Sequence, residues 1–160
     1  MSVLFSASEI VTMAIEVEKN GLDFYRAMAS RAKDEKVKNI FSFLAVEEAQ
    51  HKNTFQKLLK SLSPLELSHT EEAEYNNYLG ALTSSRLFRA DANTDELVKG
   101  IDSDIQAVDL AIGSEKESIL FYYELREQTG GEDRETVDTI IKEEKMHLAK
   151  LVKLKMDLSN

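Results

Sequence analysis

No cysteine occurs among the 160 residues of this sequence, and no stretch is long and apolar enough to span a membrane. A disulfide framework and a transmembrane helix are therefore excluded. The first residues, Met1 to Phe5, also lack the charged start and long apolar run of a signal peptide. From these absences we expect a cytoplasmic protein.

Basic residues are in the minority, with 20 Lys and Arg against 29 Asp and Glu and a net charge of −9. This charge argues against nucleic acid or an anionic membrane as a partner. A chain of 160 residues is long enough to bury a substantial core, and we expect one domain over residues 1–160.

Four long segments carry apolar residues at alternating steps of three and four, as helices packed in a bundle do. Pro64 follows the second segment, and Gly130 with Gly131 separates the third from the fourth. Two pairs are spaced as capping boxes at helix starts, Ser6 with Glu9 and Ser103 with Gln106. We expect helices at about 7–32, 35–62, 103–129 and 132–158.

Each apolar stripe contains one glutamate where the spacing predicts an apolar residue. In the second and fourth stripes a histidine follows that glutamate by three residues, nearly one helical turn, so both side chains leave the same face and can bind one metal ion. Four stripes facing one another would bring six candidate metal ligands together at mid-height: Glu18, Glu48, His51, Glu115, Glu144 and His147.

Four buried carboxylates without metal would repel one another and take up protons. Two divalent cations would leave the site formally neutral, so the pattern predicts two metal ions. Nitrogen and carboxylate ligands suit iron, manganese or zinc. A third Glu-x-x-His pair, Glu66 and His69, has no repeat partner, and we expect His69 at the surface.

The two halves of the chain repeat each other in ways that helical periodicity alone does not explain. Glu18, Phe24 and Tyr25 recur at an offset of 97, and the Glu-Glu-x-x-His motif that begins at Glu47 recurs at an offset of 96. The chain therefore consists of two helical hairpins. We expect Glu47 and its counterpart Glu143 to face solvent, although their recurrence indicates a salt bridge or support for the ligands.

Two further pairs recur beside the stripe glutamates. Tyr25 and Tyr122 lie two turns beyond a candidate ligand, where each hydroxyl could hydrogen-bond a carboxylate of the opposite hairpin or serve core packing alone. Gly21 and Ser118 lie one turn beyond a candidate ligand. These small residues either leave a pocket for dioxygen or peroxide or simply permit close helix packing.

The run AIEVEKNGLDFY at residues 14–25 resembles the first helix of rubrerythrins. AVEEAQH at 45–51 and KEEKMH at 142–147 are similar to the two metal-binding signatures of that family. The resemblance spans nearly the whole chain. It implies that the six candidate residues are ligands of a carboxylate-bridged di-iron site, with Glu48 and Glu144 as the bridges.

Two departures limit what the resemblance carries over. Rubrerythrins often have a rubredoxin domain held by four cysteines, which this sequence lacks, so we expect an external electron donor such as a separate rubredoxin-like protein. Many also have a further carboxylate one turn after the third-helix ligand, where this chain has Ser118. Glu117 is one residue short and points about 100° away, so it is a poor substitute.

Residues 63–102 form a connection too long for a hairpin turn. Helical spacing predicts one helix within Glu71–Phe88 and a shorter one near Thr94 to Gly100. Such a crossover lets two hairpins pack as an all-α, ferritin-like four-helix bundle. Its Tyr and Leu residues would cover the end of the bundle or form a dimer interface. Rubrerythrin-like proteins are commonly dimers, so we expect a homodimer.

Three functional hypotheses remain open. In the first, a di-iron oxidoreductase of rubrerythrin type reduces peroxide or dioxygen with electrons from the external donor. In the second, a ferritin-like site oxidises iron for storage or delivery. In the third, the bundle binds metal, such as zinc, for structure alone. We prefer the first over the second because no fifth helix, which often lines the symmetry axes of ferritin cages, follows residue 158.

Overall fold

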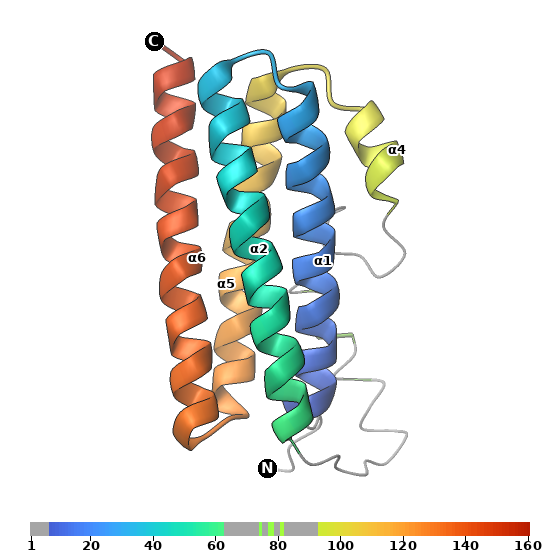
Figure 1. Ribbon diagram of the computed structural model, residues 1–160, viewed down its shortest axis with the longest axis vertical. Coiled ribbons are helices and arrows are strands. Elements are labelled where there is room, and N and C mark those ends of the chain that lie inside the picture. Colours follow the sequence, from blue (N-terminus) through green and yellow to red (C-terminus); the bar gives the residue numbers. More distant parts are fainter. Residues whose placement is uncertain (1–6, 63–73, 75–76, 79–80, 82–92) are drawn as a thin grey trace.

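The computed structural model describes residues 7–62, 74, 77–78, 81 and 93–160 (Figure 1). No strand occurs in these residues. Each predicted long helix is present, with ends within two residues of the expected ones. The helices are α1 (Ala7–Arg31), α2 (Glu35–Ser61), the short α4 (Thr94–Lys99), α5 (Asp104–Glu127) and α6 (Gly131–Leu158).

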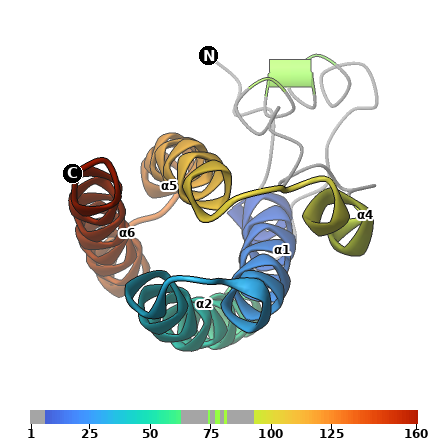
Figure 2. The ribbon, with the colours of Figure 1, turned by 90° about the horizontal axis from the view of Figure 1, so that it is seen from above.

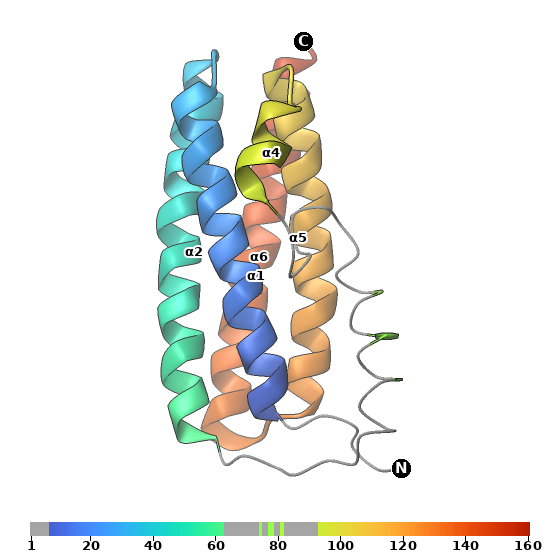
Figure 3. The ribbon, with the colours of Figure 1, turned by 90° about the vertical axis from the view of Figure 1, so that its right-hand side faces the viewer.

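The four long helices surround one core in the order α1, α2, α6, α5 (Figure 2). α1 and α6 run in one direction, and α2 and α5 run in the opposite one (Figure 1, Figure 3). α2 therefore ends at the opposite end of the bundle from the start of α5. The crossover returns the chain over about 40 Å, the length of α2 at 1.5 Å per residue. This topology confirms the predicted all-α, ferritin-like fold.

Aromatic side chains fill the core on both sides of its mid-height. Toward the turn between α1 and α2, the rings of Phe24, Tyr25 and Phe41 pack with centroids 5.4 to 6.1 Å apart. Toward the other end, Tyr122 packs against Phe55 at 5.1 Å. Burying an apolar side chain of this kind contributes about 1.5 to 3 kcal/mol. The two aromatic layers thus hold the helices together around a polar middle section.

Side chains at the helix starts tie the two hairpins together. Asp34 caps α2 by accepting hydrogen bonds from the backbone N–H groups of Lys36 and Val37. Asp104, in the first turn of α5, accepts hydrogen bonds from the N–H of Lys33 and, at 2.7 Å, from the N–H of Asp34. A side chain of the second hairpin therefore binds the backbone of the turn that joins α1 and α2.

Only one of the two hydrogen bonds of the capping box predicted at Ser103 and Gln106 is present. Ser103 Oγ accepts a hydrogen bond from the N–H of Gln106, as a helix cap does. The Gln106 side chain, however, accepts from the N–H of Asp102 at 2.8 Å instead of returning to Ser103. The other predicted box includes Ser6, which lies outside the described residues.

α4 confirms the short helix predicted near Thr94 to Gly100 and lies outside the bundle against α1 (Figure 2). Arg31 at the end of α1 donates a hydrogen bond to the carbonyl of Val98 in α4. Most of the longer predicted helix, together with Glu66 and His69, lies outside the described residues. Among the helices of the described part, none has the length and apolar character needed to cross a membrane.

Candidate metal centre

The structure brings the six candidate ligands together at mid-height of the core. The four glutamates come one from each long helix, and each lies near the middle of its helix. Donor atoms of the two Glu-x-x-His pairs lie within 4.8 Å of one another. All six side chains are buried, with exposed fractions of 1 to 5%: Glu18, Glu48, His51, Glu115, Glu144 and His147.

His51 turns its Nδ1 atom toward three carboxylates. The nearest oxygen, Oε1 of Glu144, is 2.9 Å away. Oε2 of Glu18 follows at 3.6 Å and Oε2 of Glu48 at 3.8 Å. The three carboxylates come from three different helices, so His51 lies at the point where they meet.

His147 has the corresponding surroundings in the other half. Its Nδ1 atom lies 3.2 Å from Oε2 of Glu144 and 3.4 Å from Oε1 of Glu48. Oε2 of Glu115 is 3.9 Å away. The two imidazole rings stack with their centroids 5.4 Å apart. Two similar donor sets therefore lie side by side.

Glu48 and Glu144 each direct one carboxylate oxygen toward each imidazole, whereas the other two glutamates face one imidazole each. Two metal ions that share two carboxylates would require this arrangement, with one histidine and one further glutamate for each ion. The geometry supports the expected bridging role of Glu48 and Glu144, which stays a prediction.

Several donor atoms of the cluster are buried and make no hydrogen bond, although His51 Nδ1 and Glu144 Oε1 lie 2.9 Å apart: Glu18 Oε2, Glu48 Oε1, His51 Nδ1 and Glu144 Oε1. Buried charged groups are unfavourable unless they are paired or coordinate a metal. A pair of divalent cations among these atoms would satisfy them and balance four carboxylates. The residues therefore fit a two-metal site, and carboxylate with imidazole donors suits iron, manganese or zinc.

Without metal, the cluster favours protonated carboxyl groups at two of its glutamates. Burial raises the pKa of Glu18 well above its usual value, and the nearby Glu48 carboxylate adds to the shift. Burial, followed by the charge of Glu144, raises the pKa of Glu115 in the same way. These shifts favour the protonated forms of Glu18 and Glu115, and a bound metal would compete with those protons.

The pKa values of the two histidines, Glu48 and Glu144 are shifted toward the charged forms of these groups. Burial alone would lower the pKa of His147, but contacts with Glu144 and Glu48 outweigh it and raise the pKa to about 9. The pKa of His51 is also raised, because its carboxylate contacts outweigh burial. Burial would raise the pKa values of Glu48 and Glu144, but neighbouring carboxyl groups and the imidazoles lower both. These shifts favour imidazolium beside carboxylate in the metal-free protein.

Two tyrosines join the hairpins through hydrogen bonds to candidate ligands. Tyr25 of α1 donates to Oε1 of Glu115 at 2.5 Å, and Tyr122 of α5 donates to Oε1 of Glu18. Burial raises the pKa of both hydroxyls, so they keep their protons. Each bond leaves Oε2 of the carboxylate facing an imidazole. The effect of these bonds on a bound metal stays a prediction.

Glu47 and Glu143 do more than face solvent. Their side chains are 23% and 40% exposed, and each approaches the histidine of the opposite hairpin. Oε2 of Glu143 lies 2.8 Å from Nε2 of His51, and Oε2 of Glu47 lies 3.7 Å from Nε2 of His147. The recurrence of glutamate before each ligand is the sequence signal for these contacts.

A small cavity lies between α1 and α5 beside the cluster, with about 10 Å³ for the centre of a water-sized molecule. That is room for about one water molecule. Gly21 and Ser118, the predicted pocket residues, both line it, together with Val17, Tyr25, Glu48, Ser114 and Glu115. The sequence reasoning missed Ser114, one turn before Ser118. Its Oγ is buried without a hydrogen-bond partner.

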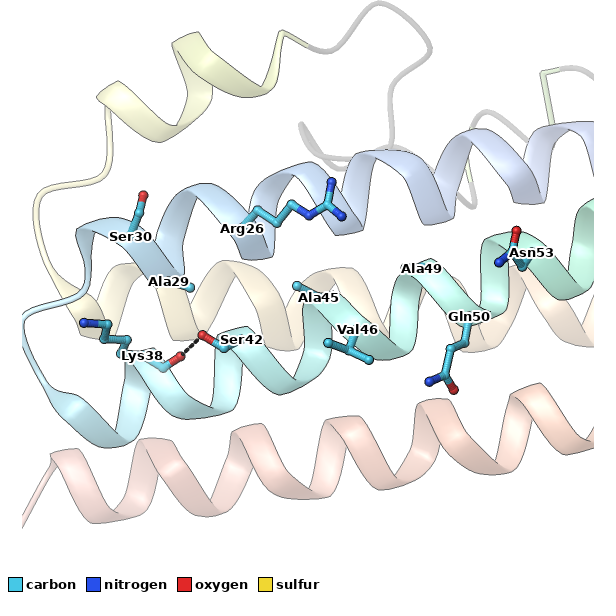
Figure 4. A pocket seen from close by; sticks show the side chains of 10 residues that line it. All are labelled: Arg26, Ala29, Ser30, Lys38, Ser42, Ala45, Val46, Ala49, Gln50 and Asn53. Atoms are coloured by element: carbon cyan, nitrogen blue, oxygen red, sulfur yellow. Dashed lines mark hydrogen bonds between the residues drawn. The ribbon is translucent and has the colours of Figure 1, made fainter.

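A larger groove of about 600 Å³ runs along the outer face of α1 and α2 (Figure 4). Small side chains such as Ala29, Ala45 and Ala49 line it, together with Arg26 and Lys38. None of the six candidate ligands is among its lining residues. The groove is therefore separate from the metal centre.

The fold and the centre define a class of protein: a ferritin-like helical bundle with a buried carboxylate and histidine site for metal. The chain belongs to the rubrerythrin family, because the family model described as Rubrerythrin matches residues 9–155. This match confirms the resemblance seen in the sequence. Proteins of this family bind di-iron, and the buried cluster fits such a site. No curated protein and no solved structure matches the chain significantly.

Proposed function

We propose that the protein is a di-iron oxidoreductase that reduces peroxide or dioxygen with electrons from an external donor. The observation that carries the proposal is the pair of similar donor sets, in which Glu48 and Glu144 face both imidazoles, beside a cavity with room for about one water molecule. Two bound ferrous ions would supply the two electrons that, together with two protons from solvent, reduce peroxide to two water molecules or dioxygen to peroxide. The chain itself would bind the ions and the oxidant and would limit access of water.

The residues around the centre support this division of tasks. The four glutamates offer four negative charges, enough to balance two divalent cations. Tyr25 and Tyr122 donate hydrogen bonds that orient the two unshared carboxylates. The aromatic layers above and below the centre are buried, which keeps water away from these two ends of the site.

We assign the cavity between α1 and α5 to the oxidant. A Cβ atom added at Gly21 would lie 3.6 Å from Cγ of Glu48, an ordinary contact distance, and would occupy space in the cavity. Gly21→Ala should therefore slow oxidation by peroxide roughly tenfold or more while metal content stays unchanged. Gly113→Ala is the matched control, because a Cβ there meets nothing within 4 Å. Equal rates in the two variants would contradict the assignment.

The proposed reaction is tested by loading the protein anaerobically with Fe(II), measuring bound iron, and mixing it with peroxide or dioxygen in a stopped-flow instrument. We expect about two irons per chain, fast oxidation by peroxide and slow oxidation by dioxygen. Rapid dioxygen-driven oxidation that continues far beyond two irons would instead identify iron storage or delivery. Iron that binds but reacts with neither oxidant would identify a structural site.

An external electron donor, a homodimeric assembly and a cytoplasmic location belong to the same proposal. The cysteine-free sequence supports electrons that come from a separate rubredoxin-like protein, since it offers no thiolates to hold iron. Repeated turnover with peroxide only when such a donor and its reductase are added would support this part. Analytical ultracentrifugation would report the oligomeric state.

A further inference from the structure

The two imidazoles of the candidate metal centre are held differently on the side away from the shared carboxylates. Nε2 of His51 hydrogen-bonds Oε2 of Glu143 at 2.8 Å, a contact between α2 and α6. Nε2 of His147 lies 3.7 Å from Oε2 of Glu47 and is buried without a hydrogen-bond partner. One ring is therefore anchored behind by a carboxylate, and the other is not.

The side chains next to the two rings also differ. The Phe43 ring packs edge-on against His147 at 6.3 Å, and Lys150 lies 5.2 Å over the Phe43 ring. At the repeat offset of 96, Phe43 corresponds to Thr139 and Lys150 corresponds to Thr54. Both threonine hydroxyls bond to carbonyls of their own helices. The bulky Phe43 thus accompanies the longer carboxylate contact at His147, and a threonine stands at the equivalent position of the other half.

A carboxylate behind a metal-binding imidazole has a defined effect. Accepting the Nε2–H proton fixes the tautomer, so that the Nδ1 lone pair points at the metal, and it fixes the plane of the ring. It also makes Nδ1 a stronger donor. Losing such a contact typically costs 10-fold to 100-fold in metal affinity. In this chain the contact is made at His51 and not at His147.

We infer that the two metal positions are inequivalent, and that Glu143 is a positioning residue that makes the position at His51 the tighter one. The inference rests on the proposed metal centre and deepens it. A divalent cation fills the His51 position first and leaves it last. The two dissociation constants differ by about 10-fold to 100-fold, the usual effect of one carboxylate behind a histidine.

Titration of the metal-free protein with Zn(II), followed by NMR of the histidine rings, tests the order of filling without any redox chemistry. The chain has three histidines, so His69→Gln leaves only the signals of His51 and His147. The contact with the Phe43 ring assigns His147. At one equivalent of Zn(II), the His51 signals should move to their bound positions while those of His147 remain. Simultaneous movement, or movement of His147 first, would overturn the inference.

Glu143→Ala and Glu47→Ala form a matched pair, because both side chains are partly exposed and both belong to a repeated motif. In chelator competition, Glu143→Ala should weaken the tighter Zn(II) constant by about 10-fold to 100-fold. Glu47→Ala should change either constant by less than about threefold. Glu143→Gln keeps an acceptor oxygen for the Nε2–H group and should recover part of the affinity.

The possible outcomes separate the inference from the proposed function. If the protein binds no Zn(II), both the metal centre and the inequivalence are wrong. If two ions bind and the two alanine variants lose affinity equally, the centre stands and only the inequivalence is wrong. A loss confined to Glu143→Ala, with rescue by Glu143→Gln, supports the role of Glu143.

Discussion

The hairpin of α1 and α2 and the hairpin of α5 and α6 agree where they face the metal centre and differ where they face away from it. Each supplies a glutamate from one helix, a Glu-x-x-His pair from the other, and a tyrosine that reaches across to the opposite hairpin. Behind the imidazoles the correspondence ends: Phe43 is matched by Thr139, and Thr54 is matched by Lys150.

This difference separates two physical requirements. Binding two divalent cations needs the same charge and donor types at both positions, and in these respects the halves are alike. How firmly each imidazole is oriented depends on contacts behind it, and in these respects Glu143 and Glu47 are unlike. The affinity and the order of filling can therefore vary without any change of ligand.

Removing a shared carboxylate should disable both halves at once, which is the largest effect we expect. Glu144→Ala and Glu48→Ala should each retain less than about a tenth of the bound metal, because both positions lose an oxygen. Glu18→Ala or Glu115→Ala should retain about half, since each removes a ligand from one position. Metal content after dialysis, with circular dichroism as a control for folding, measures this. Equal losses in all four variants would contradict the division into shared and unshared ligands.

The pH dependence of stability should have opposite signs with and without metal. In the metal-free protein the pKa of His147 is raised from 6.5 to about 9, so its stabilising contribution is complete below pH 6.5 and is lost as the pH rises to 9. That contribution is up to about 3 kcal/mol. In the zinc-loaded protein, ions compete with protons for the same atoms, so stability should increase over this range. Urea midpoints across the range measure how stability changes with pH in the metal-free and zinc-loaded forms. A change of the same sign in both forms would contradict this prediction.

Removing the hydroxyl of either tyrosine should weaken binding at one metal position, and the two losses should be similar. Tyr122→Phe frees Oε1 of Glu18 and should weaken the position at His51, whereas Tyr25→Phe should weaken the position at His147. A hydrogen bond to a charged group contributes about 1.5 to 3 kcal/mol, so we expect each dissociation constant to rise roughly tenfold. Zn(II) competition with histidine NMR assigns each loss to a position. Unchanged constants would show that the tyrosines serve packing alone.

Making one half resemble the other should have the smallest effect. Phe43→Thr gives the His147 side the residue found at Thr139, leaves room for Glu47 to approach, and should narrow the difference between the two constants about threefold. The gain is limited because the ring contact with His147, about 0.5 to 1.5 kcal/mol, is lost. The reverse change, Thr139→Phe, should weaken the His51 position. A larger difference between the two Zn(II) dissociation constants in Phe43→Thr would argue against this account.

The local sequence pattern was sufficient to predict the helices and the burial of the six candidate ligands. Spacing alone decides which residues share a face, so Leu44, Glu48 and Phe55 are placed on one buried stripe before any neighbour is known. The middle position of each glutamate in its helix follows from the helix boundaries. The hydrogen bond of Tyr25 to the opposite hairpin was one of two alternatives that the sequence left open, the other being core packing alone.

Contacts at the edges of the stripes could not be predicted in the same way. Glu143 lies about 40° around the helix from His147, where a side chain reaches either solvent or the adjacent helix. Which of these it reaches depends on α2 lying beside α6, a tertiary fact. The hydrogen bonds of Asp104 to the turn at Lys33, 71 residues away, have the same origin. Ser114 was missed because serine hydroxyls commonly bond within their own helix, as Ser42 does.

The reciprocal sharing of ligands also limits how such a protein can arise from copies of a smaller one. A single hairpin offers two glutamates and one histidine, and the partners of its tyrosine and of Glu47 lie in the other hairpin. Such a hairpin would complete the centre only by pairing with itself about a twofold axis, which gives both imidazoles identical surroundings. Fusing two copies into one chain lifts that symmetry, because a position can then change in one half alone. A fused chain can therefore have unequal metal positions, whereas a symmetric pair of identical hairpins cannot.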